Sequence, residues 1–199
     1  MKFLEESIKS ILAGIAISIG GIVYLSCENK VVGAVLFSLG LIAVVSLGLS
    51  LYTGRIGYVL DNNKSFFAYT MLSIVGNVVG CIITGIVKSP VGEVEKIVLA
   101  KLEKAPINLF VDAVFCGILI YICVEIYKKK NTFLAILFCV PAFILCGFEH
   151  SIADTFYIVN ARVFSVEALV FLLIVIVGNG VGGLLVPAML KLAKPKSEN

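Results

Sequence analysis

The chain has 199 residues, of which 60% are hydrophobic and only 15% are charged. A soluble globular domain is about half apolar and about a quarter charged, so this composition excludes that class of protein. The net charge of +3 is small and comes without a basic face that carries interleaved aromatic residues, which argues against a nucleic-acid partner.

Apolar runs of about 20 residues recur along the chain, and about 20 helical residues cross the roughly 30 Å hydrocarbon layer of a bilayer. We therefore predict an all-α membrane protein, with residues 1–199 forming a single transmembrane domain in the lipid bilayer. The six predicted spans are, in chain order, Ser7–Leu25, Val31–Ser50, Phe66–Val87, Leu109–Tyr127, Thr132–Phe148 and Ser165–Leu192. No removable signal peptide is expected, because the first apolar run is too long for one.

The segments between the spans differ in basic residues. With the N-terminus inside, the inner segments hold ten lysine and arginine residues and the outer segments hold six. The inner count includes the Lys128–Lys130 cluster together with Lys194 and Lys196. By the positive-inside rule, we expect both termini in the cytoplasm and the protein in the cytoplasmic (inner) membrane. The longest outer loop, Lys88–Lys104, is expected to contain a surface helix over Val91–Lys101.

Two of the predicted spans are interrupted by polar residues and then resume. The second continues past Ser50 until Thr53, Gly54 and Arg55 break its apolar character, and the fifth continues past Phe148 into a polar stretch. This is the pattern of a broken helix, whose freed backbone groups must be satisfied by protein or by water in a cavity. Paired interruptions in corresponding halves of a chain point to a transport site.

The two halves of the chain share a glycine–asparagine motif. Residues 76–80 read GNVVG in the third predicted span, and residues 178–183 read GNGVGG in the sixth. Because three is an odd number of spans, the halves have opposite orientations, and we predict inverted three-helix repeats at about 1–88 and 105–194. The glycines allow close approach of helices. Asn77 and Asn179 either support a broken helix or face a pore, or else make plain interhelical hydrogen bonds.

The fifth predicted span leads into Glu149, His150 and Asp154, and His150 is the one histidine of the chain. A charge at bilayer depth costs roughly 2.5–3.5 kcal/mol, so such groups normally face a bundle interior or a water-filled cavity. On a continuous helix His150 and Asp154 share a face, while Glu149 points elsewhere. Three interpretations compete: a pore histidine, a structural histidine bonded to a backbone carbonyl, and an intramembrane metal site.

A pore histidine fits the surrounding residues best. Imidazole has an unperturbed pKa near 6.5 and can give or take a proton at physiological pH. Ionised Glu149 and Asp154 would repel an anion, but N–H groups at the start of a half-helix attract anions, and Thr53 offers a hydroxyl. These parts suit a small monovalent anion as the substrate, with no cofactor and no metal. The six cysteines fit small buried residues, with a metal cluster or disulfides as the alternative.

Taken together and in order, five segments resemble the formate/nitrite transporter family. They are LYTG (Leu51–Gly54), GNVVG (Gly76–Gly80), CGILIYICV (Cys116–Val124), GFEHSIADTF (Gly147–Phe156) and GNGVGG (Gly178–Gly183). The resemblance covers nearly all of the chain, and the Gly-Phe-Glu-His core is its most specific part. It implies an aquaporin-like fold of six spans per protomer, with broken second and fifth helices. It also implies a homo-pentamer in which each protomer has its own pore for small monovalent anions such as formate, nitrite or hydrosulfide.

The resemblance further implies roles for individual residues. His150 becomes the central pore histidine and Glu149 its structural neighbour. The break of the second span and the inner constriction would be formed by Leu51, Tyr52 and Thr53. The outer apolar constriction would be formed by Phe37, Leu41 and Phe143.

At several positions the chain departs from the family pattern. Tyr121 stands where the fourth span usually has an asparagine and is a candidate pore-facing residue, while Cys116 replaces an arginine. Asp154 replaces an asparagine, and Ser50 replaces an acidic residue. Lys104 lies one residue off the spacing of the family's outer-vestibule lysine and is a candidate vestibule residue. These changes bear on the substrate more than on the fold.

We therefore predict a pH-dependent channel or transporter for small monovalent anions or their weak acids, with His150 as proton donor or relay, and not an enzyme. The alternative is an intramembrane metal-dependent enzyme that uses Glu149, His150 and Asp154, although the chain has no second histidine for the metal. A water or glycerol pore of aquaporin type is a third interpretation, but the paired Asn-Pro-Ala motifs of such pores are absent.

Overall fold

A computed structural model describes residues 1–193, and all of the regular structure in that range is helical. The elements are α1 (Lys2–Ser26), α2 (Lys30–Ser46), α3 (Tyr52–Arg55), the 3-10 helix η1 (Ile56–Asp61), α4 (Lys64–Val87), α5 (Val94–Leu102), α6 (Pro106–Lys130), α7 (Leu134–Leu145), α8 (Ser151–Ala161) and α9 (Val166–Leu192). Lys194 and Lys196, which entered the charge comparison, lie outside the described residues.

Four of these helices, α1, α4, α6 and α9, are long and apolar enough to cross a membrane. α2 and α7 are shorter apolar helices. The length and composition of these elements make the protein a multi-pass membrane protein. The expected surface helix over Val91–Lys101 is present as α5, shifted by a few residues.

The second and fifth apolar runs leave helical geometry earlier than predicted. α2 ends at Ser46 and α7 at Leu145, not at Ser50 and Phe148. Shortly after each end a glycine takes a positive φ, +62° at Gly48 and +72° at Gly147, which ends helical geometry at little cost for a residue without a Cβ. The expectation that Thr53, Gly54 and Arg55 interrupt the second run is wrong, because Tyr52–Arg55 is itself helical.

The long helices pack in corresponding pairs. α1 contacts α4 and α2, while α6 contacts α9 and α7. A Cβ on Gly14 of α1 would collide with the backbone oxygen of Asn77 in α4. In the same way a Cβ on Gly117 of α6 would collide with the backbone oxygen of Asn179 in α9. Each glycine therefore lets the two backbones touch directly beside an asparagine.

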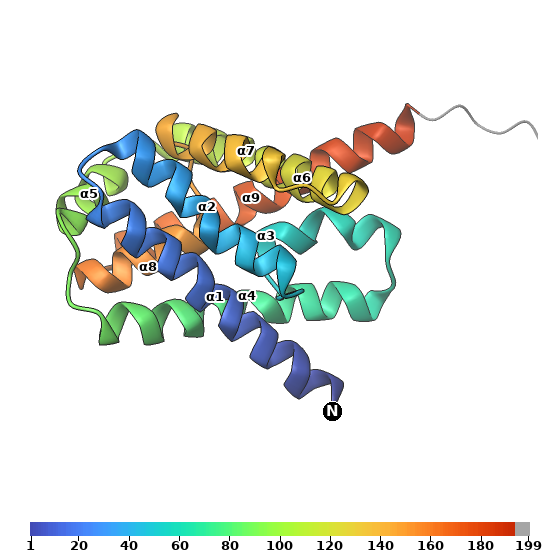
Figure 1. Cartoon of the computed structure of the whole chain (residues 1–199), viewed down its shortest axis with the longest axis horizontal. Helices are drawn as coiled ribbons and strands as arrows, with labels where there is room; N and C mark the ends of the chain where they lie inside the picture. The colour runs from blue at the N-terminus through green and yellow to red at the C-terminus, as the bar shows by residue number, and fades with distance from the viewer. Residues whose placement is uncertain (194–199) are drawn as a thin grey trace, which may run out of the picture.

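One short helix lies inside the protein along its whole length. Every residue of α8 is buried, and α8 contacts α4, α5, α1 and α9. Figure 1 shows α5 at the opposite end of the molecule from the N-terminus and the end of α9. The end of α9 therefore lies on the side where the chain begins, and the stretch Cys146–His150 leads into the buried helix α8 from the α5 side.

Candidate functional site

The non-helical stretch between α2 and α3 is held by the side chain of Asn77. The amide oxygen accepts a hydrogen bond from the backbone N–H of Tyr52 at 2.9 Å. The amide nitrogen donates to the backbone oxygens of Ser50 at 2.9 Å and of Ser10 at 2.8 Å. One buried side chain therefore satisfies backbone groups on both sides of Leu51 and joins them to α1.

The stretch between α7 and α8 is held in the same way by Asn179. Its amide oxygen accepts from the backbone N–H of Ser151 at 2.9 Å. Its amide nitrogen donates to the backbone oxygens of Glu149 at 2.8 Å and of Ala113 at 2.9 Å. Each asparagine thus supports a break and also bonds a neighbouring long helix. The bonds of Asn179 fix the backbone on both sides of His150.

His150 is 3% exposed and caps the N-terminus of α8 with its own ring. Its Nδ1 accepts a hydrogen bond from the backbone N–H of Ala153 at 3.2 Å, so the proton of a neutral ring is on Nε2. Nε2 lies 2.9 Å from the hydroxyl oxygen of Thr53 in α3. The two interrupted stretches therefore meet at a direct contact between a ring and a hydroxyl.

Two aromatic rings cover the other side of His150. The ring of Phe143 stacks on the imidazole with a centroid distance of 5.8 Å and an interplanar angle of 20°. The ring of Phe37 meets Phe143 edge-on at 6.3 Å. Both phenylalanines are buried. They form an apolar partition against the imidazole, and an apolar layer of this kind is unfavourable for a hydrated charge.

A cavity of about 300 Å³, here called the α5 cavity, opens on these rings. It is also lined by four charged residues, Lys101, Lys104, Glu149 and Asp154. Lys101 Nζ pairs with Glu149 Oε2 and lies 3.0 Å from Asp154 Oδ1. Lys104 Nζ lies 2.7 Å from Glu149 Oε1, from Asp112 Oδ2 and from the backbone oxygen of Gly147. Glu149 and Asp154 are 1% exposed, so both carboxylates are buried beside the lysines.

These contacts hold the lysines in their charged form. Burial acts to lower the pKa of Lys101, but the charges of Asp154 and Glu149 outweigh it and raise the pKa above the ordinary lysine value. Burial also opposes the charge of Lys104, and hydrogen bonds to Asp112 and Glu149 raise its pKa. The expectation that Glu149 points away from Asp154 is wrong, because His150 caps α8 instead of lying within it, and both carboxylates reach the same lysine.

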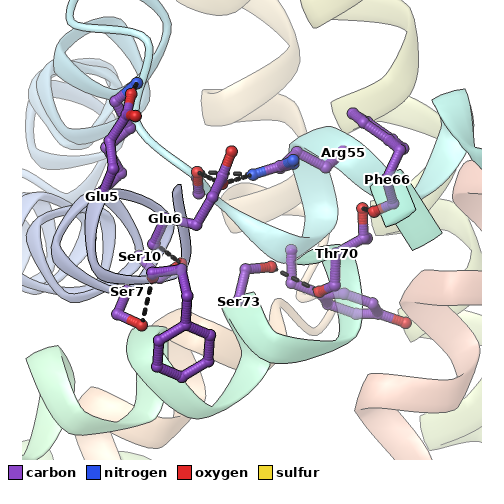
Figure 2. A network of polar contacts seen from close by, with 12 residues as sticks. Glu5, Glu6, Ser7, Ser10, Arg55, Phe66, Thr70 and Ser73 are labelled. Atoms are coloured by element: carbon purple, nitrogen blue, oxygen red, sulfur yellow. Dashed lines mark hydrogen bonds and ion pairs between the residues drawn. The ribbon is translucent and has the colours of Figure 1, made fainter. Parts of the chain in front are cut away.

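A second cavity of about 300 Å³, here called the α3 cavity, lies beside the other interrupted stretch. Leu51 and Gly54 line it together with Leu41. Glu6 of α1 reaches across to Arg55 at 2.5 Å and accepts from the hydroxyl of Ser50 at 2.8 Å (Figure 2). Lys9 and Lys128 also line this cavity, so three basic residues and one acidic residue, Glu6, line it, and the ammonium of Lys9 pairs with Glu5 at 2.6 Å.

The structure separates some residues that the sequence grouped. Leu41 lines the α3 cavity, whereas Phe37 and Phe143 line the α5 cavity. Tyr52 lines neither of these two cavities, and its hydroxyl donates to the backbone oxygen of Ile176 in α9 at 3.0 Å. Tyr121 also lines neither and packs on the ring of Tyr58 at 5.6 Å.

Sequence reasoning missed the role of Lys101. Val94 and Val98 are 1% exposed, and Lys101 follows them at helical spacing on the same face of α5. A lysine that continues the buried face of a short surface helix points toward the protein. This spacing is the feature of the sequence from which the buried position of Lys101 could have been predicted. Glu6 and Arg55 were also missed, because they come from different helices and their meeting depends on the tertiary fold.

The carboxylates and the imidazole do not form a joint metal-binding group. Glu149 and Asp154 are turned to Lys101, while both ring nitrogens of His150 bond Ala153 and Thr53. Among residues 1–193 there is no cluster of three histidine, cysteine, aspartate or glutamate side chains placed to hold a metal ion. The geometry therefore favours ion pairing over metal-assisted chemistry at this position.

Comparisons with known proteins agree on one family. A family model described as "Formate/nitrite transporter" matches residues 1–193. The chain is 28% identical over 181 residues to the formate channel FocA of Escherichia coli (strain K12), covering 75% of this chain and 63% of FocA. It therefore spans less than two thirds of the length of that relative.

Two solved structures share the fold. A structure described as "FNT family ion channel" superposes with a TM-score of 0.84 at 23% identity, covering 96% of this chain and 91% of the other. A "Pentameric formate channel with formate bound" superposes with a TM-score of 0.80 at 22% identity, covering 95% and 96%. Because the family match extends from the first residue through α9, the chain belongs to the formate/nitrite transporter family.

Proposed function

We propose that the protein conducts small monovalent anions or their weak acids, such as formate, nitrite or hydrosulfide, across the cytoplasmic membrane in a pH-dependent way. In this proposal α2 with α3 and η1, and α7 with α8, are two spans that each cross the membrane in two pieces. With α1, α4, α6 and α9 they make six spans in two inverted repeats. FocA is a formate channel and one structural relative is a pentameric formate channel, which supports a formate-like substrate and a homo-pentamer.

The contact between His150 and Thr53 carries this proposal. His150 lines the α5 cavity, and Thr53 lies between Leu51 and Gly54, which line the α3 cavity. The two cavities therefore approach each other at one polar pair. A hydroxyl both donates and accepts, so Thr53 can accept a hydrogen bond from the Nε2–H of His150 and donate its own O–H to a substrate anion, which links the ring to that anion. This supports a role of His150 as proton donor or relay.

The remaining parts follow from electrostatics. On the α3 side, Lys9, Arg55 and Lys128 line the cavity with a single carboxylate and attract an anion toward the partition. On the α5 side, Lys101 and Lys104 are already paired with carboxylates, so they attract an anion only when one of those carboxylates is neutralised. The rings of Phe37 and Phe143 oppose a hydrated charge. An anion that gains a proton crosses this apolar layer as a neutral acid, whereas a hydrated cation is excluded by the loss of its water.

The test is formate flux into proteoliposomes at pH 6 and pH 8. The variant His150→Asn keeps a polar side chain but removes the titratable ring, so we expect flux to be lost or its pH dependence to disappear. Cys146→Ser is the matched control, since Cys146 is exposed, lies in the same interrupted stretch and lines neither cavity. Unchanged flux and pH profile in His150→Asn would remove His150 from the mechanism.

The intramembrane enzyme is not favoured, because lysines already neutralise Glu149 and Asp154. Metal analysis of the purified protein separates the two functions. About one equivalent of zinc per chain, lost together with activity in His150→Asn, would restore the enzyme interpretation.

A further inference from the structure

Asp154 lines the α5 cavity, and one of its two carboxylate oxygens is unpaired. Its Oδ1 lies 3.0 Å from Lys101 Nζ, but its Oδ2 is buried and has no hydrogen-bond partner. The residue is 1% exposed and lines the cavity that contains His150. A buried carboxylate oxygen without a donor is costly, whereas a protonated oxygen at the same place can donate to a guest in the cavity.

The charges around this oxygen are already balanced. Lys101 and Lys104 bring two positive charges, and Glu149 and Asp154 bring two negative charges that contact them. Asp112 adds a further carboxylate on Lys104. When all of these groups are ionised, the cluster offers no unpaired positive charge. An anion that enters such a buried cluster adds an uncompensated negative charge, which is strongly unfavourable.

His150 is not free to supply the missing donor on this side. Its Nδ1 accepts from Ala153 and its Nε2 is taken up by Thr53, so both nitrogens face protein partners. Other titratable side chains also adjoin α8 or its N-terminus, from α4, α6, α1 and α8 itself: Cys81, Cys116, Tyr24 and Tyr157. These thiols and phenols ordinarily lose a proton only at alkaline pH. Asn179 is the nearest polar side chain of α9 and does not titrate.

On the basis of the proposed function, we infer that Asp154 is the proton-uptake residue of the α5 cavity, and that one proton binds at Asp154 Oδ2 with each anion that enters. Protonation releases Lys101 from one of its two carboxylates. The anion then binds between the ammonium of Lys101 and the new O–H of Asp154. Anion binding in this cavity is thereby coupled to the proton concentration on the α5 side.

The transfer step balances. The O–H bond at Asp154 Oδ2 breaks, and an O–H bond forms on an oxygen of the bound formate, which gives neutral formic acid and the aspartate anion. The restored carboxylate pairs again with Lys101, and the neutral acid has lost its charge attraction to that lysine. It is free to move past Phe143 toward His150. Water on the α5 side supplies the next proton.

Formate binding to the purified protein in detergent tests this inference. Calorimetric titrations at pH 9 in two buffers of different ionisation enthalpy measure the protons taken up for each formate bound. We expect one proton per formate in the wild type and none in Asp154→Asn. Asp112→Asn is the matched control, because it also removes one carboxylate charge next to a lysine, Lys104, but Asp112 does not line the cavity. This variant should keep the uptake of one proton per formate.

A second measurement uses the unmodified sequence, so it does not depend on how a variant folds. Infrared difference spectra of wild-type protein are recorded with and without formate, with natural and with carboxyl-13C-labelled aspartate. We expect a protonated-carboxyl band that appears with formate and shifts with the aspartate label. The inference is overturned if the frequency of the band does not change with the aspartate label, or if proton uptake persists in Asp154→Asn.

The two levels of the proposal fail differently. If the wild type neither binds nor conducts formate, nitrite or hydrosulfide, the proposed function itself is wrong. If the wild type conducts formate and Asp154→Asn keeps one proton per formate, the function stands and another group takes up the proton.

Discussion

At the scale of single residues, we predict that Phe143 limits the size of the solute that passes His150. Its ring stacks on the imidazole and meets Phe37 edge-on, and all three rings line the α5 cavity. Phe143→Ala removes most of that partition. We expect acetate and larger carboxylates to cross several-fold faster relative to formate, because the widened passage no longer rejects their methyl groups. Flux of a carboxylate series into proteoliposomes measures this.

The same helix offers a control for this prediction. Phe138 is also on α7 but is 69% exposed, so Phe138→Ala makes the same chemical change on the outside of the helix. It should leave the size series unchanged. If Phe143→Ala still excludes acetate as strongly as the wild type, the aromatic partition is not the size filter.

Single-residue roles could be predicted from the sequence only where the signal is local. The rarity of polar groups in an apolar run singled out His150, and the interruption of another run singled out Thr53. Their separation of 2.9 Å needed the fold. Lys101 was missed because its contacts with Glu149 and Asp154 depend on where α5 packs. Tyr52 and Tyr121 line neither cavity, because the side of a helix that faces a cavity is set by its tertiary neighbours.

At the scale of elements, each interrupted stretch depends on one asparagine. Asn179→Ala leaves the N–H of Ser151 and the carbonyls of Glu149 and Ala113 without their side-chain partner. Each unpaired buried backbone group costs about 1–3 kcal/mol, so we expect a loss of about 3 kcal/mol or more. Thermal unfolding in detergent should show a clear drop in midpoint, together with loss of formate flux.

Asn62→Ala provides the comparison for Asn179→Ala. The Asn62 amide donates to the backbone oxygen of Tyr58 at an exposed site, where water replaces the lost bond. Its unfolding midpoint should stay near that of the wild type. An Asn179→Ala protein with wild-type midpoint and wild-type flux would show that the backbone around His150 is held by other contacts.

The existence of the elements could be predicted from the sequence better than their ends. Long apolar runs are sufficient to identify α1, α4, α6 and α9, because a bilayer sets a minimum helix length. The ends of α2 and α7 depend on Gly48 and Gly147, and the positive φ of these glycines is set by the surrounding tertiary structure. The residues that read as a polar break, Thr53 to Arg55, are helical because Asn77 satisfies the backbone just before them.

At the scale of the whole molecule, the structure has two cavities of similar volume, one lined by His150 and the other by Leu51 and Gly54 on either side of Thr53, and both are lined by lysines. The α5 cavity holds its lysines in ion pairs with buried carboxylates, whereas cations outnumber carboxylates in the α3 cavity. In the proposed function, an anion meets a proton-dependent site on one side and a basic site on the other. This difference makes the orientation of the chain in the membrane part of its mechanism.

Reporter fusions in a bacterial host test that orientation. The N-terminus and the end of α9 lie at one end of the molecule and α5 at the other (Figure 1), and the Lys128–Lys130 cluster favours a cytoplasmic position for the end that carries it. We expect green fluorescent protein fused after Leu192 to fluoresce, and alkaline phosphatase fused there to be inactive. Alkaline phosphatase inserted after the exposed Gly92, ahead of α5, should be active, because the periplasm allows its disulfides to form. Replacing Lys128, Lys129 and Lys130 with glutamine should weaken the preference for this orientation. The reverse pattern of reporter activity in the unaltered chain would place the α5 cavity, and with it the proton-dependent site, on the cytoplasmic side.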